Sequence, residues 1–123
     1  MSKQYAVIGL GRFGSAVALG LAEAGQEVIA VDIEEERVQQ VSDDVTYAAV
    51  ADVTKSGVCE SLGFANIDVA VIGISSNMED SILATIMTKE AGAKYIVAKA
   101  VSDIHATILQ KVGADQIVFP ERD

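Results

Sequence analysis

The chain has 123 residues, half of them apolar, with a net charge of −9 and only one proline and one cysteine. This length suits one folded domain, and the composition excludes a disordered chain. The acidic excess argues against nucleic acid and anionic lipid as partners, because clustered Lys and Arg bind both. The sequence shows no secretion signal or membrane helix, and its lone cysteine fits a reducing cytosol.

The first predicted element is an apolar strand over Gln4–Ile8 that runs directly into a glycine-rich turn. Residues 9–14 have the GxGxxG spacing, and a helical pattern follows them. In this motif Gly9 allows a tight turn, Gly11 lets a phosphate approach the backbone, and Gly14 lets the helix pack on the strand. The helix N-terminus attracts the anion through its free amides and its dipole. The turn therefore predicts nucleotide binding.

The second predicted strand, Glu27–Asp32, ends in an acid 18 positions after Gly14. At this distance the carboxylate of Asp32 can accept both hydroxyls of an adenosine ribose and would repel a 2′-phosphate. This favours NAD, ATP or AMP over NADP. The alternative is that Asp32 caps the following helix, which opens with three consecutive glutamates at residues 34–36.

Two arginines are candidates for the same ligand. Arg12 lies inside the glycine turn, where its guanidinium can meet phosphate oxygens in two hydrogen bonds. A cation at a helix start is otherwise mildly unfavourable, which supports a phosphate partner. Arg37 can reach the ligand from the second helix or form a surface ion pair with Glu34.

Four further strands are predicted at Thr46–Val50, Val69–Ile74, Tyr95–Lys99 and Gln116–Phe119. Most are unbroken apolar runs, as in strands covered on both faces, and amphipathic helices separate most of them. Alternating strands and helices predict an α/β fold with right-handed crossovers. We expect a Rossmann-like, doubly wound parallel sheet of six strands in the order 3-2-1-4-5-6.

The ligand of such a sheet lies at the carboxyl ends of the strands, where the strand order reverses. Asp52 follows the third strand and either accepts from an adenine amino group or, in competition with Thr54, caps the next helix. Residues 75–77 (Ser-Ser-Asn) close the fourth strand and suit either a phosphate or a plain turn. Lys99 ends the fifth strand in apolar surroundings, so we expect it to pair with an anion, either a ligand or a carboxylate.

Cys59 and His105 are the only candidates for nucleophilic or metal chemistry, and neither has a partner at catalytic or ligand spacing. We expect both to serve in helix packing or to lie on the surface. A dehydrogenase would also need a substrate pocket and an acid–base group, and the sequence shows neither. This absence favours sensing over catalysis, and we expect the chain not to be an enzyme.

The chain resembles a known family over essentially its whole length. The segments that carry the resemblance are Tyr5–Gly14, Ala30–Ile33, Ala51–Thr54, Lys99–Ala100 and Gly113–Glu121. They are similar to the RCK (KTN, or TrkA N-terminal) domain of the regulatory subunits of Trk/Ktr potassium transporters. Residues 1–123 are expected to form one such N-terminal domain, without the smaller C-terminal domain of full-length relatives.

The resemblance implies a cytoplasmic regulatory domain that binds ATP, ADP, NAD(H) or AMP. It also implies homodimers that assemble, often as octameric rings, beneath an integral-membrane potassium-transporting subunit, without contact to nucleic acid or lipid. The binding residues carried over are Gly9, Gly11, Phe13 and Gly14 for phosphates, Arg12 for terminal phosphates, Asp32, Ile33 and Arg37 for the ribose side, Asp52 and Val53 for adenine, and Ser75 and Lys99 in the cleft. Glu121 matches an acidic position that holds a divalent or monovalent cation near the subunit interface.

Two other classes of protein compete with this interpretation. A cofactor-binding domain of an NAD-dependent oxidoreductase would carry the same glycine turn and acidic residue. A redox-sensing DNA-binding repressor would also bind a dinucleotide, but the negative charge and the lack of a DNA-reading helix disfavour it.

Overall fold

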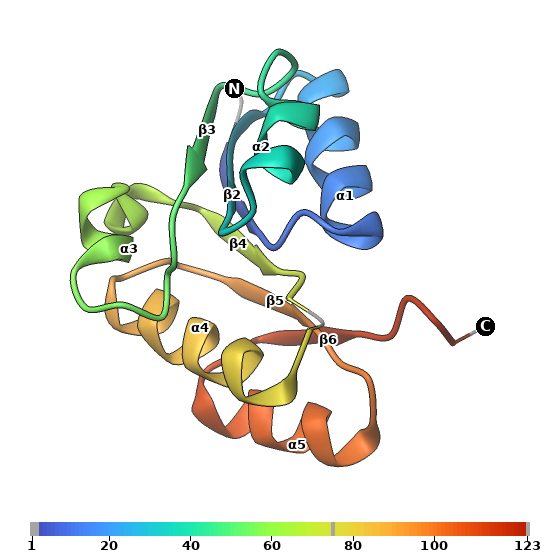
Figure 1. Ribbon diagram of the computed structural model, residues 1–123. Coiled ribbons are helices and arrows are strands. Elements are labelled where there is room, and N and C mark those ends of the chain that lie inside the picture. Colours follow the sequence, from blue (N-terminus) through green and yellow to red (C-terminus); the bar gives the residue numbers. More distant parts are fainter. Residues whose placement is uncertain (1–2, 75, 123) are drawn as a thin grey trace.

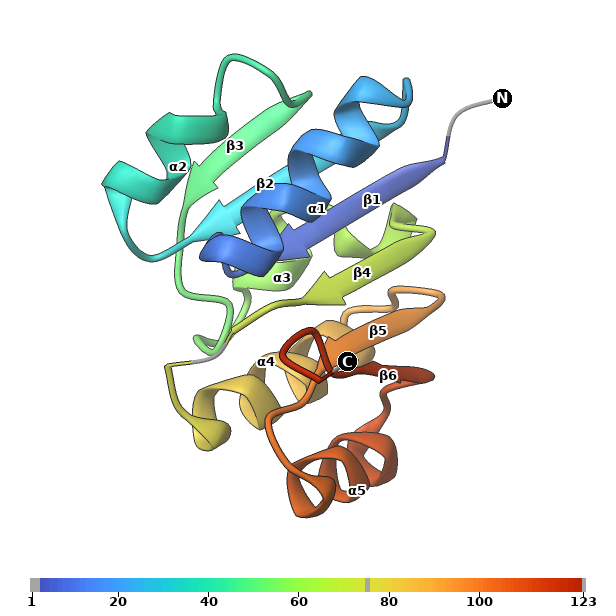
Figure 2. The ribbon, with the colours of Figure 1, turned by 90° about the vertical axis from the view of Figure 1, so that its right-hand side faces the viewer.

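A six-stranded parallel sheet in the order β3-β2-β1-β4-β5-β6 runs through the centre of the molecule (Figures 1 and 2). The computed structural model describes residues 3–74 and 76–122. The strands are β1 (Gln4–Ile8), β2 (Glu27–Asp32), β3 (Tyr47–Val50), β4 (Val69–Ile72), β5 (Ile96–Lys99) and β6 (Gln116–Val118). All neighbouring strands pair in parallel. The predicted fold class and strand order are confirmed.

Helices cover both faces of this sheet. On one face lie α1 (Arg12–Glu23) and α2 (Glu35–Val41), and on the other lie α3 (Val58–Ser61), the 3-10 turn η1 (Phe64–Asn66), α4 (Met78–Glu90) and α5 (Asp103–Val112) (Figure 1). In the described part of the chain, no helix has the length and apolar character needed to cross a membrane.

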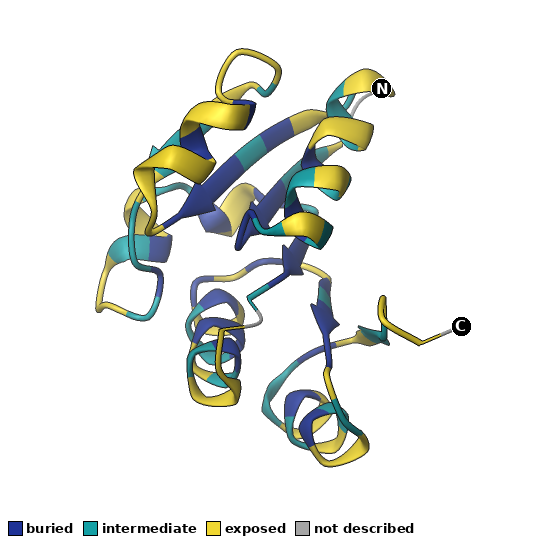
Figure 3. Cartoon of the chain, turned by 45° about the vertical axis from the view of Figure 1, so that its right-hand side comes forward, coloured by how far each residue is buried: buried dark blue, intermediate teal, exposed yellow. Residues whose placement is uncertain are grey.

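The apolar strands build two separate cores, one on each face of the sheet. Along β1 the side chains of Ala6 and Ile8 join the core under α4 and α5, while Val7 between them joins the core under α1 and α2. Successive side chains of a strand point to opposite faces, so a strand covered on both sides must be apolar throughout. Figure 3 shows the strands largely buried and the outer faces of the helices exposed.

Two boundaries differ from the sequence prediction for a physical reason. Strand β4 ends at Ile72, two residues earlier than predicted, because the next residue, Gly73, packs against the glycine turn: a Cβ there would lie 3.1 Å from the Gly9 carbonyl oxygen. The Gly73 amide still donates to the Ile8 carbonyl at 2.7 Å. The helix after β3 is the single turn α3, and it begins only at Val58. Neither Asp52 nor Thr54 caps it, so the capping alternative for these residues is wrong.

Candidate nucleotide-binding site

A cleft of about 220 Å³ opens at the carboxyl ends of β1, β2, β3 and β4, where the strand order reverses. It is lined by Ile8, Gly9, Gly11, Val31, Asp32, Ile33, Glu34, Arg37, Ala51, Asp52, Val53, Thr54, Gly73, Ile74, Ser76 and Asp80. Seven predicted site residues thus meet in one place: Gly9, Gly11, Asp32, Ile33, Arg37, Asp52 and Val53. They come from three different strand ends, and only the sheet order brings them together.

The turn between β1 and α1 requires glycine at two positions. Gly9 has a φ of +91°, and a Cβ there would lie 2.8 Å from the amide nitrogen of Ile74. A Cβ on Gly14 would overlap the carbonyl oxygen of Gly9. Glycine at position 14 therefore lets the start of α1 pack closely against the turn. Gly11 is different, because the nearest atom to its added Cβ would be an Arg37 nitrogen at 3.8 Å. A side chain at Gly11 would therefore fit the protein but occupy space in the cleft.

The start of α1 offers amides to a ligand. The first helical hydrogen bond of α1 runs from the Ser15 amide to the Gly11 carbonyl at 2.9 Å. The amides of Arg12, Phe13 and Gly14 precede this bond and belong to the first turn, whose N–H groups have no partner inside a helix. Together with the helix dipole they favour an anion at this end of the cleft.

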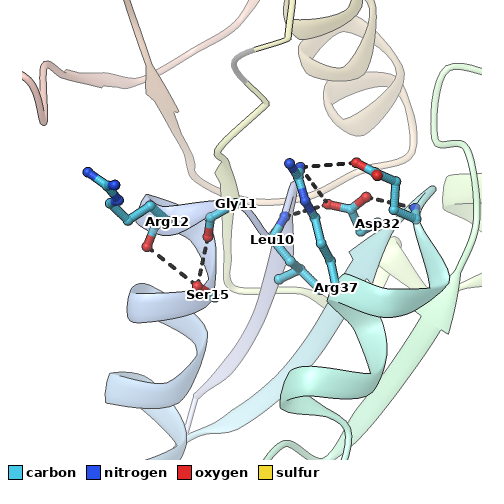
Figure 4. Close-up of polar contacts among 7 residues, drawn as sticks. Leu10, Gly11, Arg12, Ser15, Asp32 and Arg37 are labelled. Atoms are coloured by element: carbon cyan, nitrogen blue, oxygen red, sulfur yellow. Dashed lines mark hydrogen bonds and ion pairs between the residues drawn. The ribbon is translucent and has the colours of Figure 1, made fainter.

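Asp32 is the buried carboxylate of the site, with 6% of its surface exposed. Its Oδ2 accepts the Leu10 amide at 2.7 Å, and its Oδ1 accepts the Glu34 amide at 2.8 Å (Figure 4). The carboxylate thus ties the glycine turn to the loop that starts α2, although the N-cap of α2 is Glu34. Each oxygen keeps a further lone pair that can accept a ribose hydroxyl.

Arg37 forms the ion pair with Glu34 that was one of its two predicted roles, and it also lines the cleft. Its guanidinium lines the cleft, and its Nη1 lies 3.4 Å from the Glu34 carboxylate and 3.9 Å from Asp32 Oδ2 (Figure 4). The side chain is about half exposed. Arg37 therefore stands beside the Asp32 carboxylate with freedom to turn toward a ligand.

Asp52 is held at the far side of the cleft by its neighbour Thr54. The Thr54 hydroxyl donates to Asp52 Oδ1 at 2.6 Å, and the Thr54 amide donates to the same oxygen at 3.0 Å. The hydroxyl bond, with help from the amide and Lys55, lowers the pKa of Asp52 below its usual value. At neutral pH the group is thus a charged acceptor with no proton to donate.

Several predicted residues lie elsewhere. Arg12 is exposed and points away from Asp32 and Arg37 (Figure 4). Phe13 and Gly14 lie in the first turn of α1 and are not among the described residues that line the cleft, and Ser75 falls outside the described residues. The lining also includes Asp80, which the sequence analysis missed. Its signal was the Asn-x-x-Asp spacing at residues 77–80, a helix-start pattern directly after a strand end.

Lys99 and Glu121 pair with each other outside the cleft, with Nζ and Oε1 3.0 Å apart. Lys99 is buried and Glu121 is mostly exposed. Of the two anionic partners expected for Lys99, the structure therefore holds a carboxylate. Within residues 3–74 and 76–122, no three His, Cys, Asp or Glu side chains gather in a metal-binding arrangement.

Cys59 and His105 are both buried, as expected for packing residues. Burial raises the pKa of the Cys59 thiol, which keeps it protonated and unreactive. The His105 ring lies between α4 and α5, where its Nδ1 accepts the Val101 amide at 3.1 Å and its Nε2 lies 3.0 Å from Ser81 Oγ. Neither group reaches the cleft.

The sheet order and the glycine turn define this chain as a Rossmann-like α/β domain. Residues 5–120 match the TrkA-N domain, and the chain belongs to that family. Ktr system potassium uptake protein C of Bacillus subtilis (strain 168) is 44% identical over 123 residues, which make up 100% of this chain and 56% of that protein. Ktr system potassium uptake protein A of Vibrio alginolyticus is 46% identical over 121 residues, 98% of this chain and 55% of that protein.

The chain thus spans about half the length of the curated relatives it matches. These relatives are potassium uptake proteins, in agreement with the expectation that the chain is not an enzyme.

Solved structures share the fold. The NAD(P)-binding domain of an exopolyphosphatase-related protein from Archaeoglobus fulgidus has a TM-score of 0.83 at 24% identity, covering 94% of this chain and 86% of that one. The GsuK channel bound to NAD has a TM-score of 0.81 at 14% identity, covering 96% and 21%. The AMP-bound Kef C-terminal domain from Shewanella denitrificans has a TM-score of 0.76 at 19% identity, covering 95% and 70%.

Proposed function

We propose that this chain is the nucleotide-sensing regulatory domain of a potassium uptake system. The observation that carries the proposal is that the glycine turn at the start of α1 and the buried carboxylate of Asp32 line one cleft, in a relative of potassium uptake proteins. Gly9, Gly11, Phe13 and Gly14 hold the phosphates, and Asp32 with Ile33 and Arg37 holds the ribose. Asp52 and Val53 bind adenine. Ser75 and Lys99 are proposed to complete the cleft when a ligand is bound.

The ligand is an adenine nucleotide: ATP, ADP, AMP or NAD(H). Solved neighbours of the same fold hold NAD, ADP and AMP, which supports this class of ligand. Arg12 is the group that would distinguish a long phosphate chain from a short one. Its exposed guanidinium must turn toward the cleft to do so, and that turn is the event we propose the ligand drives.

To regulate potassium uptake, the chain must contact further copies of itself and a membrane subunit. We propose that two copies of the chain form a dimer, that the dimers form an octameric ring, and that this ring lies in the cytoplasm against an integral-membrane potassium-transporting subunit. Glu121 is proposed to hold a divalent or monovalent cation near the interface between copies, after releasing Lys99. The exposure of its carboxylate supports this role.

Calorimetric titration of the chain with ATP, ADP, AMP and NADH tests the proposal. We expect binding of at least one of them, and we expect Arg12→Ala to weaken ATP more than AMP. Equal losses for the two nucleotides would contradict the role of Arg12. No binding of any nucleotide at millimolar concentration would refute the sensing function, and NADH oxidation with a hydroxy or keto acid as partner would favour an oxidoreductase.

A further inference from the structure

The cleft carries far more negative than positive charge. Among its lining residues are four carboxylates, those of Asp32, Glu34, Asp52 and Asp80, against the single guanidinium of Arg37. That guanidinium already lies 3.4 Å from Glu34 and 3.9 Å from Asp32. A polyphosphate that enters this cleft therefore meets an unfavourable field, which the amides at the start of α1 must overcome.

Three of these carboxylates have an assigned use or a cation beside them. Asp32 accepts two backbone amides and is proposed to accept the ribose, Asp52 is proposed to accept adenine, and Glu34 pairs with Arg37. Asp80 is left without a role in ribose or base binding. It comes from α4, which follows β4, whereas Asp32 and Arg37 come from the β2 side. The glycine turn after β1 lies between the two sides and lines the same cleft as Asp80, so a phosphate chain held by the turn would have the Asp80 carboxylate in the opposite wall, on the β4 side.

The position of Asp80 is fixed by a reciprocal pair of hydrogen bonds with Asn77. The Asp80 amide donates to Asn77 Oδ1 at 2.7 Å, and Asn77 Nδ2 donates to Asp80 Oδ2 at 3.0 Å. Asn77 is thus the N-cap of α4, and its side chain makes both hydrogen bonds with Asp80. It also keeps the carboxylate on the wall of the cleft instead of letting it swing away from an approaching anion.

We propose that Asp80 makes the cleft select adenine nucleotides by phosphate charge. It disfavours each added phosphate, so that AMP, or a dinucleotide with one charge on each phosphate, is preferred over ATP that carries no cation. Asp80 thus opposes Arg12, which is proposed to attract terminal phosphates. This inference rests on the proposed nucleotide function and names the charge class of ligand that the cleft takes.

Asp80→Asn tests the inference with Glu79→Gln as its matched control. Both changes remove one negative charge from the first turn of α4, but Glu79 is exposed and does not line the cleft. Asparagine at position 80 keeps an oxygen that can accept from Asn77. Affinities for AMP, ADP and ATP are measured by calorimetry in EDTA at low salt, and for ATP again with Mg²⁺.

We expect Asp80→Asn to tighten ATP roughly threefold to tenfold and ADP less, with about twofold or less for AMP, as a nearby charge in water-like surroundings would. Glu79→Gln should change all three by less than about twofold because its charge is screened by solvent. Mg²⁺ should reduce the gain for ATP. Equal gains for AMP and ATP, weaker ATP binding, or the same result from Glu79→Gln would overturn the inference. Absence of nucleotide binding by the wild-type chain would instead refute the proposed function.

Discussion

The acidic side chains of the cleft differ in how many of their oxygens are already bonded. Both oxygens of Asp32 accept backbone amides, which makes this carboxylate part of the fold as well as of the site. Asp52 receives both of its hydrogen bonds on Oδ1. In the described part of the chain its Oδ2 has no hydrogen-bond partner, so it is the oxygen that can accept from a base. An acceptor without a proton suits the 6-amino group of adenine and not the 6-oxo group of hypoxanthine.

This arrangement makes Thr54 a positioning residue for Asp52. In Thr54→Val the hydroxyl bond is lost, and we expect the pKa of Asp52 to rise toward its ordinary value of about 3.9. We also expect the preference for AMP over IMP to fall, because the carboxylate is then held by the Thr54 amide alone. Carboxyl-carbon NMR titration measures the pKa, and calorimetry with the two nucleotides measures the preference. Thr107→Val on the exposed face of α5 is the control; an unchanged Asp52 pKa in Thr54→Val would contradict the role.

At the scale of elements, the sequence predicted those features that depend on the residues of one segment alone. The apolar runs predicted all six strands. The glycine spacing and the position of Asp32 predicted the turn after β1 and the carboxylate at the end of β2, which the Leu10 amide joins by a hydrogen bond. The sequence did not predict that the helix after β3 is a single turn that begins only at Val58, after Gly57 in the left-handed conformation. It also missed Asp80 as a lining residue of the cleft. Only the placement of α4 beside the cleft distinguishes Asp80 from any other acid at a helix start.

Helices α4 and α5 are joined by a buried histidine whose protonation state is fixed by its partners. Because the Val101 amide donates to Nδ1, the ring proton of His105 sits on Nε2 and points at Ser81 Oγ. Burial lowers the pKa of His105 below its ordinary value of about 6.5. A second proton on Nδ1 would face the Val101 amide, with two donors opposed. The neutral ring is therefore the form that holds the two helices together.

This predicts a loss of stability on mild acidification. Below about pH 6.5 the unfolded chain binds a proton at this histidine while the folded chain does not, so the free energy of unfolding falls as the pH falls. The fall ends at the lowered pKa of the folded state, and the full stability is present above pH 6.5. Urea unfolding at pH 7.5 and 5.5 measures the effect.

His105→Gln should flatten this pH dependence, since glutamine does not titrate. The chain has one histidine, so a single ring resonance reports its pKa by NMR. A folded-state pKa at or above 6.5, or an equal pH dependence in the variant, would contradict the assignment.

For the whole molecule, the cleft connects ligand binding to folding. The two halves of the sheet meet at β1 and β4, and the cleft lies over that junction with walls from both. A nucleotide bound there, as we propose, would contact the β2 side and the β4 side at once, and the unfolded chain offers no such arrangement. Any ligand that binds only the folded state stabilises it by mass action.

We therefore expect a nucleotide at a hundred times its Kd to stabilise the chain by about 2.7 kcal/mol, which raises the Tm by about 10 °C for a domain of this size. Because the chain has no tryptophan, circular dichroism at a helix wavelength is the suitable measurement.

Gly11→Ala should abolish the shift in Tm, since the added methyl fits the protein but stands where the phosphate approaches. Gly20→Ala in α1, where a Cβ meets nothing within 4 Å, should retain the shift and raise the Tm of the free chain. A shift that survives in Gly11→Ala would mean that the nucleotide binds elsewhere on the surface.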